Sequence, residues 1–218
     1  MKPAEYDAWY DSPRGRWIGA TEYRLLLDLL RPRRGEWMLD VGCGTGWFTR
    51  RFAARPGLQV TGVDVDAESL EFARGRDAGC AYLRADARDL PFADGSFDCV
   101  VSVAALCFVV DWRVALKEVL RVTRSRFAIG LLNRNSLLWR EKGQDGGSGA
   151  YRGAHWHTNR ELRTELERLH ARNIRIRSGI LLPSGSPLAR TAERILPSLL
   201  PWGGFIVVAG NVSSVRRV

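Results

Sequence analysis

The chain has 218 residues, which is more than the common domain size of roughly 150 residues but too few for two such domains. With 45% hydrophobic and 10% aromatic residues it is globular, and this composition excludes a disordered, collagen-like or coiled-coil chain. The net charge of +9 is uneven: residues 1–100 carry 14 basic and 16 acidic side chains, and residues 101–218 carry 19 and 8. We expect one domain over 1–218, with its basic character in the second half.

The beginning of the chain and its apolar runs bear on where the protein resides. The first residues lack the apolar stretch of a secretory signal, and the longest apolar run, 100–110, is shorter than the roughly 18 residues of a membrane span. We therefore expect a cytoplasmic protein without membrane contact. The four cysteines have no paired metal spacing, which favours reduced thiols; they are Cys43, Cys80, Cys99 and Cys107.

In chain order, short apolar runs alternate with stretches whose apolar residues recur at helical spacing. Helices are predicted over 22–30, 47–54, 68–74, 112–122 and 161–169. Strands are predicted over 37–41, 59–63, 81–85, 98–103, 127–132, 175–181 and 205–211. This alternation is typical of an α/β protein with a doubly wound, Rossmann-like, mostly parallel seven-stranded sheet that has helices on both faces.

Two segments interrupt the alternation. Residues 143–153 include five glycines, which disfavour regular structure. Residues 183–204 include four prolines around a short helical pattern at 188–196. We interpret 133–158 as a loop and 183–204 as an insertion on the substrate side of the domain.

The stretch 38–47 combines an apolar strand, glycines at 42, 44 and 46, and the start of a helix. Such a turn lets the backbone approach a ligand closely, and the free amides of the helix start favour a polar or anionic group. A dinucleotide fingerprint would place its third glycine where Trp47 stands, and an indole prevents that close packing. The pattern therefore predicts a nucleotide-like cofactor other than a dinucleotide.

Carboxylates follow the next two predicted strands. Asp64 stands at the end of the second strand, where such an acid accepts hydrogen bonds from both ribose hydroxyls in doubly wound folds. Asp86 follows the third strand on the same edge of the sheet, in a position to accept from an adenine amino group.

With these motifs in order, residues 1–132 resemble the class I S-adenosylmethionine-dependent methyltransferases, similar to the ubiquinone/menaquinone-biosynthesis group. The resemblance rests on 39–46, on Val63-Asp64, on Ala85-Asp86-Ala87 with 90–92, and on 96–98. It implies a seven-stranded sheet with an antiparallel last strand, and an N-terminal segment, 1–30, that covers the cofactor. One departure is that 121–126 lack the family's Gly-Gly turn before the fifth strand.

Carried over by position, the resemblance implies S-adenosylmethionine as the cofactor. The glycines would line its methionine portion, Asp40 would support the loop and the amino group, and Asp64 would bind the ribose. The full set of expected cofactor residues is Asp40, Gly42, Cys43, Gly44, Gly46, Asp64, Val65, Asp86, Ala87, Val103 and Ala104.

Catalytic residues are not evident, as expected for an activated methyl group that mainly requires alignment. His155 and His157 would lie on one face of an extended segment and could act as a base or as two metal ligands, but no third ligand is evident, so we expect no metal. Tyr10 is another candidate, and 133–135 follow the fifth strand at the edge where ligands bind.

Three functions remain open. The leading one is methyl transfer to a small-molecule acceptor, with an anionic acceptor as the finer expectation, because the basic excess falls on the substrate side. The alternative is a tRNA or rRNA methyltransferase that uses the basic second half. A non-catalytic cofactor-binding module is the third, and the intact glycines and Asp64 argue against it. The sequence carries no indication of oligomeric state.

Overall fold

The computed structural model describes residues 2–77, 79–196 and 198–212. Seven strands form one sheet in the order β3-β2-β1-β4-β5-β7-β6. Their bounds are β1 Trp37–Val41, β2 Gln59–Asp64, β3 Ala81–Arg84, β4 Phe97–Val103, β5 Thr123–Leu132, β6 Arg172–Gly179 and β7 Phe205–Asn211. Neighbours from β3 to β5 pair in parallel, and β7 is antiparallel to both β5 and β6. The predicted fold class and the antiparallel last strand are confirmed.

The helices alternate with the strands as expected. They are α1 Pro3–Trp9, α2 Pro13–Leu30, α3 Trp47–Ala53, α4 Ala67–Arg76, α5 Trp112–Val122, α6 Leu137–Lys142, α7 Asn159–Arg168 and α8 Pro187–Ile195, with 3-10 turns η1 Leu106–Phe108 and η2 Gly149–Tyr151. α1 and α6 were not predicted, and α2 begins nine residues before its predicted start at 22. Ser12 caps α2 by accepting from the Gly15 amide, and Pro13 occupies its first position, so the helix begins there.

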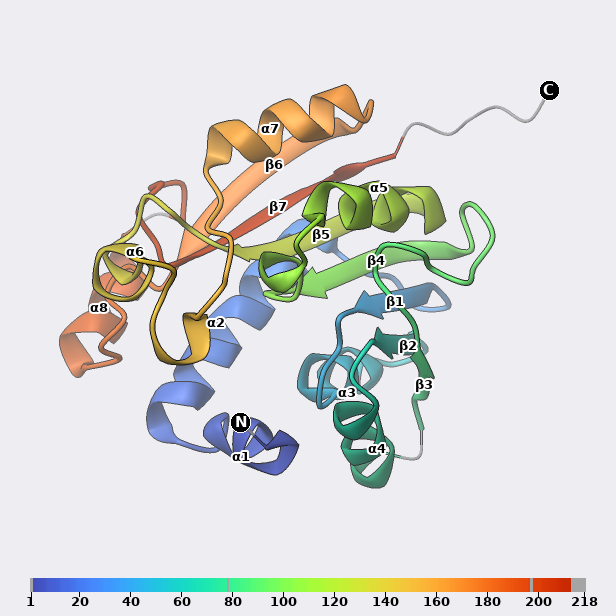
Figure 1. Cartoon of the computed structure of the whole chain (residues 1–218), viewed down its shortest axis with the longest axis horizontal. Coiled ribbons are helices and arrows are strands. Elements are labelled where there is room, and N and C mark those ends of the chain that lie inside the picture. The colour runs from blue at the N-terminus through green and yellow to red at the C-terminus, as the bar shows by residue number, and fades with distance from the viewer. Residues whose placement is uncertain (1, 78, 197, 213–218) are drawn as a thin grey trace.

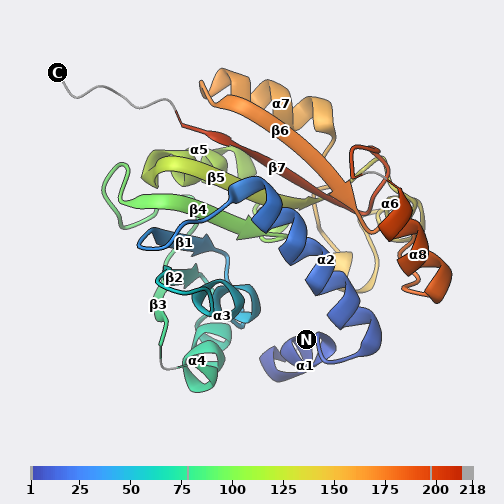
Figure 2. The same ribbon diagram turned by 180° about the vertical axis from the view of Figure 1, so that it is seen from behind.

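Two apolar layers cover the two faces of the sheet (Figures 1 and 2). Adjacent residues of β1 point to opposite faces: Leu39 packs in the cluster with α5 and α7, and Met38 packs in the cluster with α2 and α3. Because helices bury both faces of the sheet, its strands must be apolar on both sides. Cys99 and Cys107 are buried free thiols. Among the described residues, no helix is long and apolar enough to cross a lipid bilayer.

The missing Gly-Gly turn is replaced by a direct connection, since β5 starts at Thr123, immediately after α5. Arg121, at the end of α5, pairs with Glu118 at 2.7 Å and with Asp94 at 2.9 Å. Its guanidinium also donates to the carbonyls of Leu90 and Phe92. These bonds secure the α5 end to the segment that precedes β4. β5 begins four residues earlier than predicted because Thr123 already pairs with Phe97 of β4.

The N-terminal segment lies against the first half of the sheet. Asp7 of α1 is buried and pairs with Arg50 of α3 at 2.8 Å and with Arg76 of α4 at 3.3 Å. These ion pairs place α1 beside the helices that follow β1 and β2, next to the carboxyl edge of the sheet (Figure 2). That position agrees with a segment that covers a ligand at this edge.

Asn133 connects the two segments assigned to the substrate side. It is fully buried, and its side-chain amide donates to the carbonyls of Pro201 and Gly203 at 2.7 Å each. The candidate role of Asn133 in substrate contact is therefore wrong, because its amide is used to join 133–158 to 183–204.

Replacing Arg126 of β5 would measure how much a mostly buried ion pair contributes to the free energy of unfolding. It contacts both oxygens of Glu36 at 2.6–2.7 Å and donates to the Leu30 carbonyl at 3.0 Å. We expect Arg126→Met to lower the free energy of unfolding by about 2–3 kcal/mol, because Glu36 loses its charged partner in a poorly hydrated place. Urea unfolding followed by circular dichroism measures the loss.

Arg124→Met is the matched control on the same strand. Its pair with Asp98 at 2.8 Å is formed by a mostly exposed arginine, so the expected loss is below about 1 kcal/mol. Equal losses in the two variants would contradict the assigned role of Arg126.

Candidate active site

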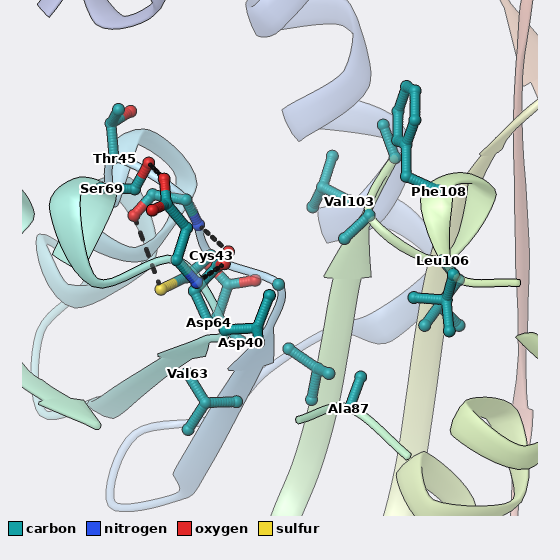
Figure 3. A pocket seen from close by; sticks show the side chains of 18 of the residues that line it. Asp40, Cys43, Thr45, Val63, Asp64, Ser69, Ala87, Val103, Leu106 and Phe108 are labelled. Carbon is teal, nitrogen blue, oxygen red and sulfur yellow. Dashed lines mark hydrogen bonds between the residues drawn. The ribbon is translucent and has the colours of Figure 1, made fainter. Parts of the chain in front are cut away.

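A cavity of about 570 Å³ lies at the carboxyl edge of β1, β2 and β4 (Figure 3). The strand order reverses between β1 and β4, which is where doubly wound sheets bind ligands. Its volume falls in the range of roughly 300–1,000 Å³ that is usual for small-molecule sites. Ten of the eleven predicted cofactor residues line it: Asp40, Gly42, Cys43, Gly44, Asp64, Val65, Asp86, Ala87, Val103 and Ala104.

Gly42 and Gly46 shape the turn after β1, and both have a positive φ, +74° and +76°. A Cβ at Gly42 would lie 2.1 Å from the Cβ of Ala105, so the loop can approach the end of β4 only with glycine there. Gly46 starts α3 behind the cavity and is not in its lining. A Cβ at Gly46 would lie 2.6 Å from the Tyr82 hydroxyl, so this glycine serves packing and not the predicted cofactor contact.

Asp64 connects the end of β2 to the glycine loop. One carboxylate oxygen accepts from the Gly44 amide at 2.7 Å, and the other accepts from the Asp66 amide at 2.9 Å. Each oxygen keeps a lone pair for a further donor. The carboxylate is therefore oriented by two amides and still able to bind two ribose hydroxyls.

Asp40 is nearly inaccessible at the end of β1. Its carboxylate accepts from the Thr49 hydroxyl at 2.7 Å, so its partner belongs to α3 and not to the loop. Burial raises the pKa of Asp40 to about 7, and the hydrogen bond from Thr49 opposes that rise. A cationic group nearby would favour its ionised form.

The far end of the cavity carries Asp86, Ala87 and Arg88. The Asp86 carboxylate accepts a bidentate pair from the Arg88 guanidinium at 2.7–3.1 Å, and this side-chain bond lowers the pKa of Asp86. Arg88 thus competes with the adenine amino group that was expected to donate to Asp86.

The opposite wall is apolar and aromatic. Figure 3 shows Val103, Leu106 and Phe108 across the cavity from Asp64. Ala104 has a φ of +56°, which is unusual for a residue with a side chain and turns the chain sharply after β4. This wall resembles an acceptor site more than a cofactor site, because it offers few polar groups.

Tyr10 and Tyr6 also line the cavity. The Tyr10 ring stacks on Trp47 with centroids 4.1 Å apart, and its hydroxyl lies 3.4 Å from that of Tyr6. The candidate Tyr10 is therefore at the site, with its ring fixed by packing and its hydroxyl toward a second phenol.

Glu22 of α2 belongs to the segment 1–30, which the resemblance assigns to covering the cofactor. Glu22 is partly buried, and the desolvation of its carboxyl raises its pKa to about 8. It contributes to raised pKa values of Tyr6, Tyr10 and Tyr151, so these three phenols lie around it. The sequence could have indicated this role, because Glu22 falls at helical spacing among apolar residues such as Ile18 and Leu29.

His155 and His157 are outside the cavity lining, on the other side of η1. The His155 amide donates to the Cys107 carbonyl at 2.7 Å, which places the two histidines behind the cavity wall. The structure therefore does not bring them to the reacting end of the site. Glu161, the first residue of the helix predicted over 161–169, lies beside both of them.

Fold and site define a class of protein that binds a nucleotide-like cofactor at the carboxyl edge of a doubly wound sheet. The family described as "Methyltransferase domain" matches residues 39–127. Protein Rv2003c of Mycobacterium tuberculosis, described as uncharacterized, is 34% identical over 219 residues, which cover 94% of this chain and 70% of that protein. The chain belongs to the class I S-adenosylmethionine-dependent methyltransferases, and its cofactor is S-adenosylmethionine.

Further relatives fit this membership. A methyltransferase of Thermotoga maritima, described as a possible histamine N-methyltransferase, superposes with a TM-score of 0.76 at 26% identity and 96% coverage of both chains. A malonyl-[acyl-carrier protein] O-methyltransferase of Erwinia pyrifoliae is 38% identical over 126 residues, 55% of this chain and 48% of that protein. The chain thus spans about half the length of this curated relative.

The residues present fit the cofactor. A Cβ on Gly44 would meet nothing within 4 Å, so the loop leaves open space for a ligand, and the Thr45 hydroxyl is buried without a partner among the described residues. Asp40 and Asp64 supply two carboxylates for a cofactor that carries a sulfonium and an amino group. When bound, S-adenosylmethionine supplies an activated methyl group.

Asp64→Asn tests the ribose assignment. We expect at least a tenfold loss of S-adenosylmethionine affinity, because the amide replaces one of the two oxygens, which accept from the Gly44 and Asp66 amides and would accept from the ribose, by a donor. Isothermal titration calorimetry measures the change. Asp28→Asn, at an exposed position of α2, is the control, and its binding should be unchanged. Equal affinities in the wild type and both variants would refute the assignment.

Proposed function

We propose that the chain transfers a methyl group by in-line displacement to an oxygen of a small anionic acceptor. The acceptor would lie between the phenols of Tyr6 and Tyr10 and the apolar wall of Leu106 and Phe108. The relative from Erwinia pyrifoliae is by name an O-methyltransferase that acts on a malonyl group, which is a carboxylic acid. An in-line attack requires mainly that the nucleophile be placed opposite the leaving sulfur.

The observation that carries the anionic acceptor is the uncharged donor set around Glu22. With a pKa raised to about 8, the Glu22 carboxyl would be mostly protonated at neutral pH and able to donate a hydrogen bond, as the three neighbouring phenols could. Arg14 adds positive charge near Tyr151, since it lowers the pKa of that phenol. Neutral donors and one cation stabilise an oxyanion and disfavour a cationic acceptor.

The RNA alternative rests on the basic second half. Several arginines of that half are paired with carboxylates, including Arg113, Arg121, Arg124, Arg126 and Arg168. Among the described residues that line the cavity, Arg88 is the one arginine, and Asp86 binds it. These pairings reduce the positive charge available to a phosphate backbone and support the small acceptor.

Transfer of a labelled methyl group separates the two candidates. The protein is incubated with tritiated S-adenosylmethionine and with either a panel of small carboxylic acids, free and thioester-linked, or total tRNA. We expect label in an acid, released by mild alkali as from a methyl ester. Label in the tRNA, with none in the acids, would overturn the proposed acceptor.

Glu22→Gln tests the donor role through the pH profile. If protonated Glu22 binds the acceptor, kcat/KM of the wild type falls about tenfold from pH 7 to pH 9, as the carboxyl ionises and repels an anion. Glutamine keeps a donor and cannot ionise, so the variant should retain most activity at pH 7 with a flat profile. A general base would instead give activity that rises with pH and is lost in Glu22→Gln, and that result would contradict the donor role.

A further inference from the structure

Three side chains with metal-binding atoms converge on the far side of η1, away from the cofactor cavity. The His155 Nε2 lies 3.2 Å and 3.4 Å from the two carboxylate oxygens of Glu161, and the His157 Nδ1 lies 3.8 Å from one of them. One donor atom from each of the three residues lies within 4.8 Å of the others. Sequence alone supplied two of the three, because Glu161 comes from the next helix.

Backbone bonding brings the three together. The His157 amide donates to the Leu132 carbonyl at 2.9 Å and its carbonyl accepts from the Arg134 amide at 2.9 Å, so 155–157 run beside the end of β5 as an extended segment. Alternate residues of an extended segment share a face, which places both imidazoles on one side. Thr158 then caps α7, and Glu161 sits in its first turn.

His157 is the unusual member. Its side chain is fully buried, and both ring nitrogens are without a hydrogen-bond partner among the described residues. A neutral imidazole has one N–H donor and one lone pair, and leaving both unsatisfied in a buried place costs free energy.

We propose that His155, His157 and Glu161 form a binding site for a divalent transition-metal ion of the Zn²⁺ type. Two imidazoles and one carboxylate are the donor set that such ions prefer, and the ligand atoms of a tetrahedral zinc site lie about 3.3 Å apart. The observed separations of 3.2–4.8 Å need only small side-chain rotations to reach that value. His155 is partly exposed, so a fourth position faces solvent.

The surroundings also fit a metal site. Arg113 donates to one oxygen of Glu161 at 3.1 Å, which leaves the oxygen nearest His157 for the ion, and a ligating carboxylate is usually bonded in this way. The Trp112 ring stacks against His155 and meets His157 edge-on, with centroids 5.8 Å and 4.7 Å apart, and so fixes both imidazoles. The ion would join the extended segment 155–157 to the first turn of α7.

Metal binding by the untagged protein tests the proposal. Zn²⁺ is measured by equilibrium dialysis with elemental analysis, and Co²⁺ by the visible bands of a low-coordinate site. We expect one ion per chain in the wild type and at least a tenfold weaker affinity in His155→Ala and in Glu161→Gln. His155 is half exposed, so its variant should fold, and circular dichroism verifies this.

The control is His170→Ala, which removes the third histidine of the chain and should bind as the wild type does. Binding that is equal in wild type, His155→Ala and Glu161→Gln would assign the ion to other groups, such as the thiols of Cys43 and Cys80, and would overturn the proposal. Absence of binding to the folded wild type would overturn it as well. Neither result depends on methyl transfer.

Discussion

The hydrogen bond from the Gly44 amide to the Asp64 carboxylate is the interaction on which the cofactor half of the site depends. It joins the loop after β1 to the end of β2, two strands that already pair in parallel, and so fixes the loop at the edge of the sheet. Gly42 makes this position accessible, because any side chain there would collide with Ala105 at the end of β4. The carboxylate that orients the loop is thereby also placed to bind the ribose.

The acceptor half of the site is formed by helices and loops and not by the strand ends. Its residues come from α1, α2, η1 and the 133–158 segment, which the sheet positions only indirectly. Asp7 secures α1 to α3 and α4, and Asn133 secures the segment after β5 to that before β7. The side chains of the two halves differ as well: Asp40, Asp64 and Asp86 line the cofactor part of the cavity, whereas the phenols of Tyr6 and Tyr10 line the part proposed for the acceptor, with the Glu22 carboxyl near them. A cationic cofactor and an anionic acceptor suit this division.

Much of the fold could be predicted from the sequence because strands buried on both faces leave strong apolar runs. The bounds 37–41, 112–122 and 205–211 match the structure. α1 and α6 were missed since they have only seven and six residues, too short for a clear periodic pattern, whereas the equally short α3 follows a recognisable glycine motif. The cofactor residues could be found because one local motif and the strand ends carry them.

Other residues of the site were beyond sequence reasoning for a physical reason. Glu22 is close enough to raise the pKa of Tyr151 although 129 positions separate them, and Glu161 lies beside His155 only because α7 folds back toward the extended segment. Gly46 and Asn133 stand at positions typical of ligand contacts. Gly46, however, leaves room for the Tyr82 hydroxyl, and the Asn133 amide donates to two backbone carbonyls. Such roles follow from tertiary contacts, which spacing along the chain does not encode.

A crystal structure of the protein with S-adenosylhomocysteine tests the central claim most directly. The account predicts both ribose hydroxyls on Asp64, the amino acid portion beside the loop of Gly42 and Gly44, and the sulfur facing Tyr10 and Leu106. A ligand bound elsewhere, or with its adenosine against the wall of Leu106 and its ribose away from Asp64, would contradict it.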